Sequence, residues 1–167
     1  LLDDRDQKTY ETVLIGDQCW MAENIDIGVR VDAELEQFNN NIIEKFCYDD
    51  DPVYCDTYGG LYLWDEAMQY ATTTAAQGIC PDGWHMPSES EWCTIEQFVD
   101  PEITCTSMGW RGIDGGGKLK EEGTLHWQDP NTGATNESEF TALPGGRYNY
   151  QGNGAFENLT VQGYWWS

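Results

Sequence analysis

The clearest indication of architecture in this chain is Cys80-Pro81-Asp82-Gly83-Trp84-His85-Met86-Pro87-Ser88-Glu89-Ser90-Glu91-Trp92. The stretch joins a cysteine, a Gly-Trp turn and a helix start in one short unit. Ser88 and Glu91 make a Ser-x-x-Glu capping box, in which each side chain satisfies a backbone N–H that the first helical turn leaves unpaired. No reaction chemistry requires this order of residues, so the stretch indicates a particular fold rather than an activity.

The spacing of apolar residues predicts two helices. The later helix starts at Ser88 and ends before Pro101, and its expected buried stripe is Trp92, Ile95 and Val99. The earlier helix is expected over Tyr62–Ala71, because apolar side chains recur there at helical spacing: Leu61, Trp64, Met68 and Ala71. These are the two helices that the sequence indicates clearly.

Strands are expected at the start of the chain. Lys8–Ile15 and Gln18–Glu23 alternate in a way that predicts an opening hairpin, with its turn at Gly16-Asp17. The chain then becomes polar from Asp26 to Glu44, which predicts a surface loop with a short helical piece near Ala33–Phe38.

Composition is consistent with one domain over residues 1–167. Eight Trp, nine Tyr and five Phe, together with eighteen Gly and six Pro, predict a core of aromatic wedges between turns. The tail after Gly115-Gly116-Gly117 predicts short strands and long loops. The expected fold class is therefore α+β, with two helices around short antiparallel sheets and long irregular loops.

The charge of the chain excludes several partners. Thirty acidic residues against eight basic ones give a formal net charge of −22. Such a protein repels nucleic acid and anionic membrane surfaces. No stretch is long and apolar enough to span a bilayer, so we expect neither nucleic-acid binding nor direct membrane insertion. A solvated acidic surface is the simplest role for the carboxylates.

The six cysteines predict disulfides, because no two of them have the tight spacing of a zinc site. The shortest separations indicate Cys47–Cys55 and Cys93–Cys105, which leaves Cys19–Cys80 by elimination, although six cysteines admit many other pairings. Disulfides indicate an oxidising compartment, so an extracellular or cell-surface location is expected.

Six further stretches of the sequence point in the same direction as the Cys80–Trp92 stretch. They are Asp3 to Tyr10, Ile15 to Asn24, Cys47 to Cys55, Tyr58 to Trp64, Phe140 to Gly146 and Trp165-Trp166-Ser167. Together they resemble the Fibrobacter succinogenes major paralogous domain, a module of bacterial and archaeal surfaces. The resemblance covers nearly the whole chain and implies a C-type-lectin-like fold.

The resemblance also implies a difference at the end of the chain. Members of the family usually continue past the Trp-Trp-Ser block to a final strand that pairs with the first one, whereas this sequence stops at Ser167. We therefore expect a domain without its closing strand, and an open edge there would favour self-association.

Catalytic residues are not expected. His85 lies inside the Gly-Trp-His-Met-Pro turn, where a hydrogen-bonded structural role is predicted, and His126 has no partner that the sequence suggests. The stretch Pro87 to Trp92 is similar to a helix motif of formylglycine-generating enzymes, which share the lectin-like fold. Those enzymes bind copper with a late cysteine pair, and no cysteine here lies beyond Cys105. The similarity therefore implies a shared scaffold, and no cofactor is required.

Calcium is the one metal that the sequence suggests. Four aspartates crowd the loop near Cys47 and Cys55: Asp49, Asp50, Asp51 and Asp56. Oxygen-rich loops suit Ca²⁺, so Asp49 and Asp51 are candidate ligands, although the EF-hand glycine and glutamate are missing. A solvated acidic turn is the alternative, and the triplets by which calcium-dependent lectins hold sugar are absent from the sequence.

The tail is the best candidate for ligand recognition. It mixes aromatic, amide and glycine residues as antibody loops do, and in lectin-like folds this part of the chain faces the ligand. The candidate contact residues are Arg147, Tyr148, Asn149, Tyr150, Asn153 and Phe156. The alternative is that these aromatics fill an irregular core. Trp165 and Trp166 are expected in the core.

Two functions follow as hypotheses. The first is an exported, non-catalytic binding or adhesion module for a protein or glycan ligand, in one variant the variable protein of a diversity-generating retroelement. The second is the structural head domain of a pilin-like surface filament subunit.

Overall fold

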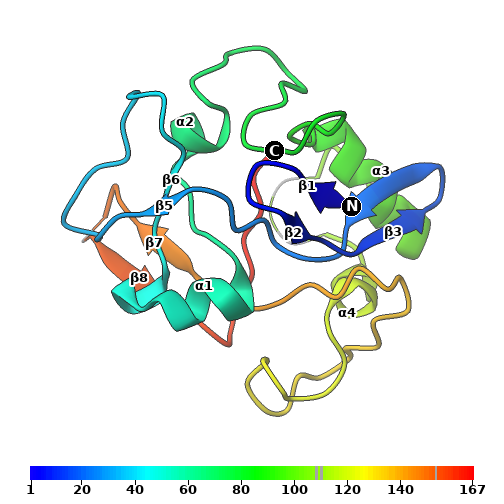
Figure 1. Cartoon of the computed structure of the whole chain (residues 1–167). Coiled ribbons are helices and arrows are strands. Elements are labelled where there is room, and N and C mark those ends of the chain that lie inside the picture. Colours follow the sequence, from blue (N-terminus) through cyan, green and yellow to red (C-terminus); the bar gives the residue numbers. More distant parts are fainter. Residues whose placement is uncertain (108, 110, 153) are drawn as a thin grey trace.

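In the computed structural model, which describes residues 1–107, 109, 111–152 and 154–167, short helices and two-stranded ladders are joined by long irregular segments (Figure 1). The strands are β1 (Leu2–Asp3), β2 (Lys8–Thr9), β3 (Thr12–Ile15), β4 (Gln18–Met21), β5 (Val29–Arg30), β6 (Glu44–Lys45), β7 (Arg147–Asn149) and β8 (Ala155–Glu157). The helices are α1 (Pro52–Tyr58), α2 (Trp64–Ala67), α3 (Glu89–Val99) and α4 (Gly115–Leu119), with a 3-10 turn, η1, at Tyr48–Asp50. The predicted α+β class is confirmed. None of the helices in these described ranges has the length and apolar character needed to cross a bilayer.

The predicted opening hairpin is present with shorter strands. β3 and β4 pair antiparallel, with Val13 opposite Trp20 and Leu14 opposite Cys19. The pairs β1–β2 and β7–β8 are also antiparallel, whereas β5 and β6 pair in parallel. Because side chains alternate across a strand, Ile15 and Trp20 point inward while Leu14 and Cys19 are exposed.

Helix α3 begins at the predicted capping box. The Ser88 hydroxyl accepts a bond from the Glu91 backbone N–H, and the Glu91 carboxylate accepts one from the Ser88 N–H at 2.8 Å. Of the predicted stripe, Ile95 and Val99 are buried and Trp92 is partly buried. Ile95 lies in the main apolar cluster, whose buried members are Ile15, Trp20, Ile95, Phe140 and Ala142. The helix therefore packs its inner face on the β3–β4 hairpin and the segment before β7.

The earlier predicted helix is much shorter than expected. Instead of Tyr62–Ala71, only α2 is helical, because Gln69 and Tyr70 adopt left-handed backbone conformations that end it. The predicted helical piece near Ala33–Phe38 is also wrong, since that segment forms turns without a helix.

Two helices lie where none was predicted. Asp51 caps α1 by accepting a bond from the Val53 N–H, and Pro52 occupies its first turn, where a missing N–H does no harm. Helix α4 begins in the run Gly115–Gly117, which sequence propensity disfavours. A side chain at Gly117 would meet the Gly133 carbonyl at 2.1 Å, so a close backbone approach explains the glycine there.

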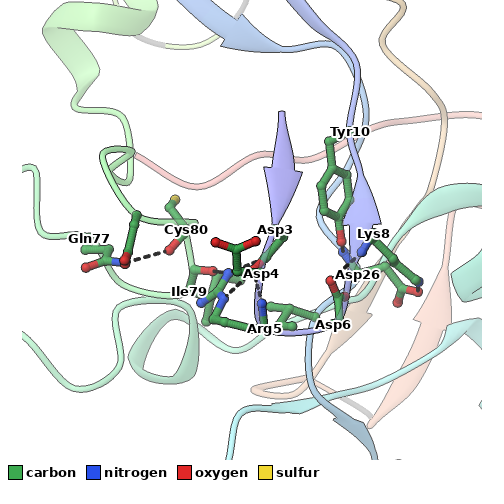
Figure 2. Close-up of polar contacts among 12 residues, drawn as sticks. Asp3, Asp4, Arg5, Asp6, Lys8, Tyr10, Asp26, Gln77, Ile79 and Cys80 are labelled. Carbon is green, nitrogen blue, oxygen red and sulfur yellow. Dashed lines mark hydrogen bonds and ion pairs between the residues drawn. The ribbon is translucent and has the colours of Figure 1, made fainter.

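Arg5 connects the start of the chain to the segment that precedes the Cys80 unit (Figure 2). Its guanidinium donates to both carboxylate oxygens of Asp3, at 2.8 and 2.6 Å, and to the Ile79 carbonyl at 2.7 Å. The hydrogen bonds from Arg5 lower the pKa of the buried Asp3 carboxyl. The N-terminal turn is thus tied to a segment far away in the sequence.

A second network of ion pairs and hydrogen bonds surrounds the buried carboxylate of Asp26. The ammonium groups of Lys8 and Lys45 both bond to it. The Tyr10 hydroxyl accepts the Asp26 backbone N–H at 3.1 Å, and Figure 2 shows Tyr10, Lys8 and Asp26 close together. Lys45 also donates to the Asp26 carbonyl at 2.8 Å. The buried Asp26 charge is thus balanced by two opposite charges and by further hydrogen bonds, as a buried charge requires. Since Lys8 belongs to β2 and Lys45 to β6, these bonds connect the two strands to the segment around Asp26.

Two of the three predicted disulfides are present. Cys47–Cys55 and Cys93–Cys105 are bonded, with Cα–Cα distances of 5.1 and 5.7 Å. The third prediction, Cys19–Cys80, is wrong in this structure, where both thiols are free. Cys19 is exposed on β4, whereas Cys80 is buried with its Sγ 3.6 Å from Met86 Sδ. Burial raises the pKa of the Cys80 thiol to about 11. Pairing by elimination fails because it assumes that every cysteine is oxidised.

Candidate functional site

The predicted tail strands form the hairpin β7–β8. Arg147 pairs with Glu157, Tyr148 with Phe156, and Asn149 with Ala155. One candidate contact residue, Asn153, lies outside the described residues. The cross-strand pairing of β7 and β8 therefore brings the other predicted contact residues together in one hairpin.

Gly146 explains why the sequence block before this hairpin ends in glycine. Its φ is 65°, in the left-handed region, and a Cβ atom there would lie 2.5 Å from the Glu157 carbonyl oxygen. Only glycine allows the chain to turn into β7 this close to β8.

The inner side of the hairpin is a packing surface. The half-buried Tyr148 ring lies 4.8 Å from that of the fully buried Phe46 and 5.1 Å from Phe156, measured between ring centres. Phe156 in turn lies 5.2 Å from Tyr48, and the Tyr148 hydroxyl donates to the Ala33 carbonyl at 2.8 Å. Tyr148 and Phe156 thus attach the hairpin to the rest of the chain with much of their ring area.

The outer side presents the exposed candidates. Arg147 donates to Glu157 through Nε and Nη2, at 3.1 and 2.9 Å, and lies 5.3 Å from the Tyr164 ring centre. Asn149 donates to the other Glu157 oxygen at 3.2 Å. The hydrogen bonds from Asn149 and Arg147 lower the pKa of Glu157. Tyr150 is 44% exposed and its hydroxyl donates to Glu36 at 2.7 Å. These contacts hold the polar groups in place while leaving them open to solvent.

A loop that the sequence does not mark as a binding region lies against this hairpin. Segment 31–43 runs from β5 to β6 and meets the hairpin through the Tyr148–Ala33 and Tyr150–Glu36 bonds, as their neighbouring positions in Figure 1 also show. The loop exposes the large apolar side chains of Leu35 and Phe38, each 58% exposed, and of Ile42, 52% exposed. The sequence hardly indicates a binding role for Leu35 and Phe38, because each of them lies between polar residues.

Buried polar side chains hold this loop without a helix. The buried amide of Gln37 accepts the Leu63 N–H at 2.8 Å and donates to the Leu61 carbonyl at 3.2 Å. The buried Glu44 carboxylate accepts the Phe38 N–H at 3.1 Å. Since buried polar groups are costly unless bonded, these pairs specify one loop conformation. We name the exposed residues Leu35, Phe38, Arg147 and Tyr150, together with the half-buried Asn149, the hairpin surface.

The predicted calcium ligands, Asp49 and Asp51, lie in the acidic loop before and at the start of α1. Asp51 accepts the Val53 N–H at 3.0 Å as a helix cap, and Asp50 accepts the Ala33 N–H at 2.8 Å. Asp49 is exposed. Among residues that the structure describes, no three His, Cys, Asp or Glu side chains gather in a way that could hold a metal ion. Calcium binding at Asp49 and Asp51 stays a prediction, in which the Asp51 carboxylate would have to serve both the helix cap and the ion.

The two histidines each bond to a carboxylate. His85 Nε2 lies 2.8 Å from Glu91 Oε1, which confirms its predicted hydrogen-bonded role, and His126 Nδ1 lies 2.8 Å from Glu121 Oε1. The Ser88 hydroxyl bonds to the Glu91 carboxylate at 2.7 Å rather than to the imidazole. Ser88, His85 and Glu91 therefore lack the contact between a hydroxyl nucleophile and an imidazole base that a catalytic triad requires.

A second feature is a cavity of about 590 Å³ beside α3. The sequence predicts Trp165 and Trp166 in the core, but they are 38% and 46% exposed and line this cavity. The prediction is wrong because it considers only the size of the apolar side chains. Here each indole lies across the rim and packs with part of its surface, Trp165 on Trp92 and Trp166 on Trp64.

Comparison with known proteins identifies the family. No curated protein and no solved structure matches this chain. Residues 13–167 match the family model described as the Fibrobacter succinogenes major domain. That match covers nearly all of the chain, including the β3–β4 hairpin, the capped helix α3 and the β7–β8 hairpin. The chain therefore belongs to the Fibrobacter succinogenes major domain family.

Proposed function

We propose that this chain is an exported, non-catalytic binding or adhesion module with a C-type-lectin-like fold, which recognises a protein or glycan ligand. The hairpin surface is the recognition site. The observation that carries the proposal is that the loop exposing Leu35 and Phe38 is held by buried polar groups and is bonded, through Glu36, to the exposed Tyr150.

The composition of the hairpin surface suits recognition. Tyrosine and arginine dominate binding energy at protein interfaces because they combine large contact area with hydrogen bonding. Leu35 and Phe38 add apolar area next to Tyr150, and Arg147 and Asn149 provide donors around it. Since the side chains of Arg147, Asn149 and Tyr150 are already hydrogen-bonded, these three lose less conformational entropy on binding.

Other properties support export and a surface location. The Cys47–Cys55 and Cys93–Cys105 bonds are stable in an oxidising compartment. The net charge of −22 disfavours nucleic acid as the ligand. The family name does not specify a ligand, so the choice between protein and glycan rests with experiment.

The test is a binding screen with surface glycans and with intact cells that share the protein's habitat, followed by titration of any hit. We expect Tyr150→Ala to weaken binding about tenfold or more, because truncating a central interface tyrosine has this effect. Leu125→Ala is the matched control, since Leu125 is an exposed apolar residue elsewhere. Unchanged affinity of Tyr150→Ala and of Phe38→Ala would refute the hairpin surface as the site. Filaments that form irrespective of both changes would favour the pilin-like alternative.

A further inference from the structure

Five tryptophans contribute to the wall of the cavity beside α3. Its wall includes Trp20, Trp84, Trp92, Trp165 and Trp166, which come from β4, the Cys80 turn, α3 and the end of the chain. A volume of about 590 Å³ lies within the range of small-molecule and side-chain pockets. The hairpin-surface residues are not among those that line it, so the cavity is a separate site.

Three of these indoles are held in fixed orientations by their own N–H groups. Trp92 donates to the Trp166 carbonyl at 3.1 Å, and Trp166 donates to the Tyr62 carbonyl at 2.9 Å. Trp165 donates to the Asn24 side-chain oxygen at 3.2 Å. Because these donors are engaged, what the three rings offer a ligand is their apolar faces. The negative face of an indole ring attracts cations.

The charges at the cavity have one sign. Glu23 and Glu91 line it, and no lysine or arginine is found among the described residues of its lining. The one imidazole of the lining, His85, is bonded to Glu91. The whole chain carries a net charge of −22, which raises the local concentration of cations around any such opening.

We propose that this tryptophan cavity binds a cationic group carried on an apolar stem, namely a lysine or arginine side chain of a basic peptide. The stem packs on the indole faces and the charge lies over them near Glu23. A neutral saccharide is the less favoured occupant, because it needs hydrogen-bond donors and the indole N–H groups of Trp92, Trp165 and Trp166 are already engaged.

The test measures binding of the tripeptide Lys-Lys-Lys to the whole chain by calorimetry, with Gly-Gly-Gly and cellopentaose as the other probes. We expect Lys-Lys-Lys to bind and the neutral tripeptide not to bind. Trp165→Ala should weaken the affinity about tenfold, as loss of a partly desolvated cation–π contact does. Because this change leaves the net charge unaltered, equal affinity of wild type and variant would show a general charge effect and overturn the proposal.

Charge is tested with a matched pair. Glu23→Gln should weaken Lys-Lys-Lys binding, whereas Glu137→Gln, an exposed glutamate outside the cavity, should not. Equal effects of the two changes would contradict a local site. Binding of cellopentaose that Trp165→Ala removes, without binding of Lys-Lys-Lys, would identify a saccharide pocket and overturn the cationic assignment.

A measurement on the unaltered protein guards against unfolding of the variants. In a two-dimensional NMR spectrum, the indole N–H signals of Trp84, Trp165 and Trp166 should shift on addition of Lys-Lys-Lys. The signal of Trp127 should not, since Trp127 is buried outside the cavity and donates to the Ala142 carbonyl. Shifts spread over all tryptophans, or confined to others, would refute the site.

Discussion

The core beneath α3 and the hairpin surface use aromatic and apolar side chains in opposite ways. Under α3, Ile15 and Ile95 pack with Ala142 and the inner parts of the aromatic rings and lose contact with water. At the hairpin surface, Phe38 stays exposed while the buried side chains of Gln37 and Glu44 order its loop, and the exposed Tyr150 bonds to Glu36 of that loop. Where apolar burial orders the chain, its side chains are unavailable to a ligand. Where buried hydrogen bonds order the chain, its apolar side chains remain exposed and can contact a ligand.

The largest expected loss of stability is at Ile95, a fully buried residue of the apolar cluster under α3. Ile95→Ala removes apolar volume from a packed cluster, so we expect it to lower the free energy of unfolding by about 3–4 kcal/mol. Denaturant unfolding followed by tryptophan fluorescence measures this. Phe98→Ala on the exposed side of the same helix is the control and should change stability by less than about 1 kcal/mol. A similar loss in both would contradict the division between the two faces of α3.

The two tyrosines of the hairpin should behave differently from each other. Tyr148→Ala should lower stability by about 2–3 kcal/mol, because its ring packs on Phe46 and Phe156. Tyr150→Ala should lower it by less than about 0.5 kcal/mol, since its one bond to Glu36 is exposed. Equilibrium unfolding of both variants, alongside ligand titration, separates packing from recognition. Equal stability losses would show that Tyr150 is a packing residue too.

A smaller effect is expected at the start of the hairpin. Gly146→Ala places a Cβ atom near the Glu157 carbonyl in a left-handed conformation, and should cost about 2 kcal/mol. Gly123→Ala is the matched control, because Gly123 also has positive φ but a Cβ atom there would meet no other atom within 4 Å. Hydrogen exchange of β7 and β8 amides should increase only in Gly146→Ala. Equal exchange in the two variants would mean that strain, not the close approach, dominates.

The last prediction concerns acid and the end of α3. The buried Asp100 carboxylate accepts backbone N–H bonds from Ile113, Asp114 and Gly115, and the bond from Ile113 is the largest cause of its lowered pKa. A carboxyl whose folded pKa is below its unfolded value, about 3.9, stabilises the fold fully above that value. The stabilisation is lost as pH falls through the lower, folded pKa.

Thermal unfolding of wild type and Asp100→Asn as a function of pH measures this contribution. The difference between the two proteins should be constant near neutrality and should shrink below about pH 4. A difference that stays the same down to the acid limit would show that the Asp100 charge is not what holds the segment around Ile113.

Much of the fold was predictable where the signal is local. The β3–β4 hairpin follows from alternation on either side of Gly16-Asp17, and the start of α3 follows from the Ser88–Glu91 capping box. The disulfides Cys47–Cys55 and Cys93–Cys105 join cysteines close in sequence. Each of these patterns lies within a few residues, so no knowledge of distant contacts was needed.

The candidate site was predictable only in part. The composition of the tail indicated Arg147 and Tyr150, which the structure places at exposed positions of one hairpin. It did not indicate Leu35 and Phe38, because the loop that carries them is ordered by Gln37 and Glu44 bonding to partners far along the chain. Nor did it separate the packing role of Tyr148 from the exposure of Tyr150.

The amino-acid order was thus sufficient for the family, the α+β class, the hairpin β3–β4 and the capped helix α3, because short-range sterics and hydrogen bonding dictate them. Tertiary contacts alone determined which aromatics are exposed. Trp165 and Trp166 line a cavity instead of filling the core, and Cys19 and Cys80 stay unbonded. The physical reason is that burial depends on the sum of contacts from distant segments, which no local pattern contains.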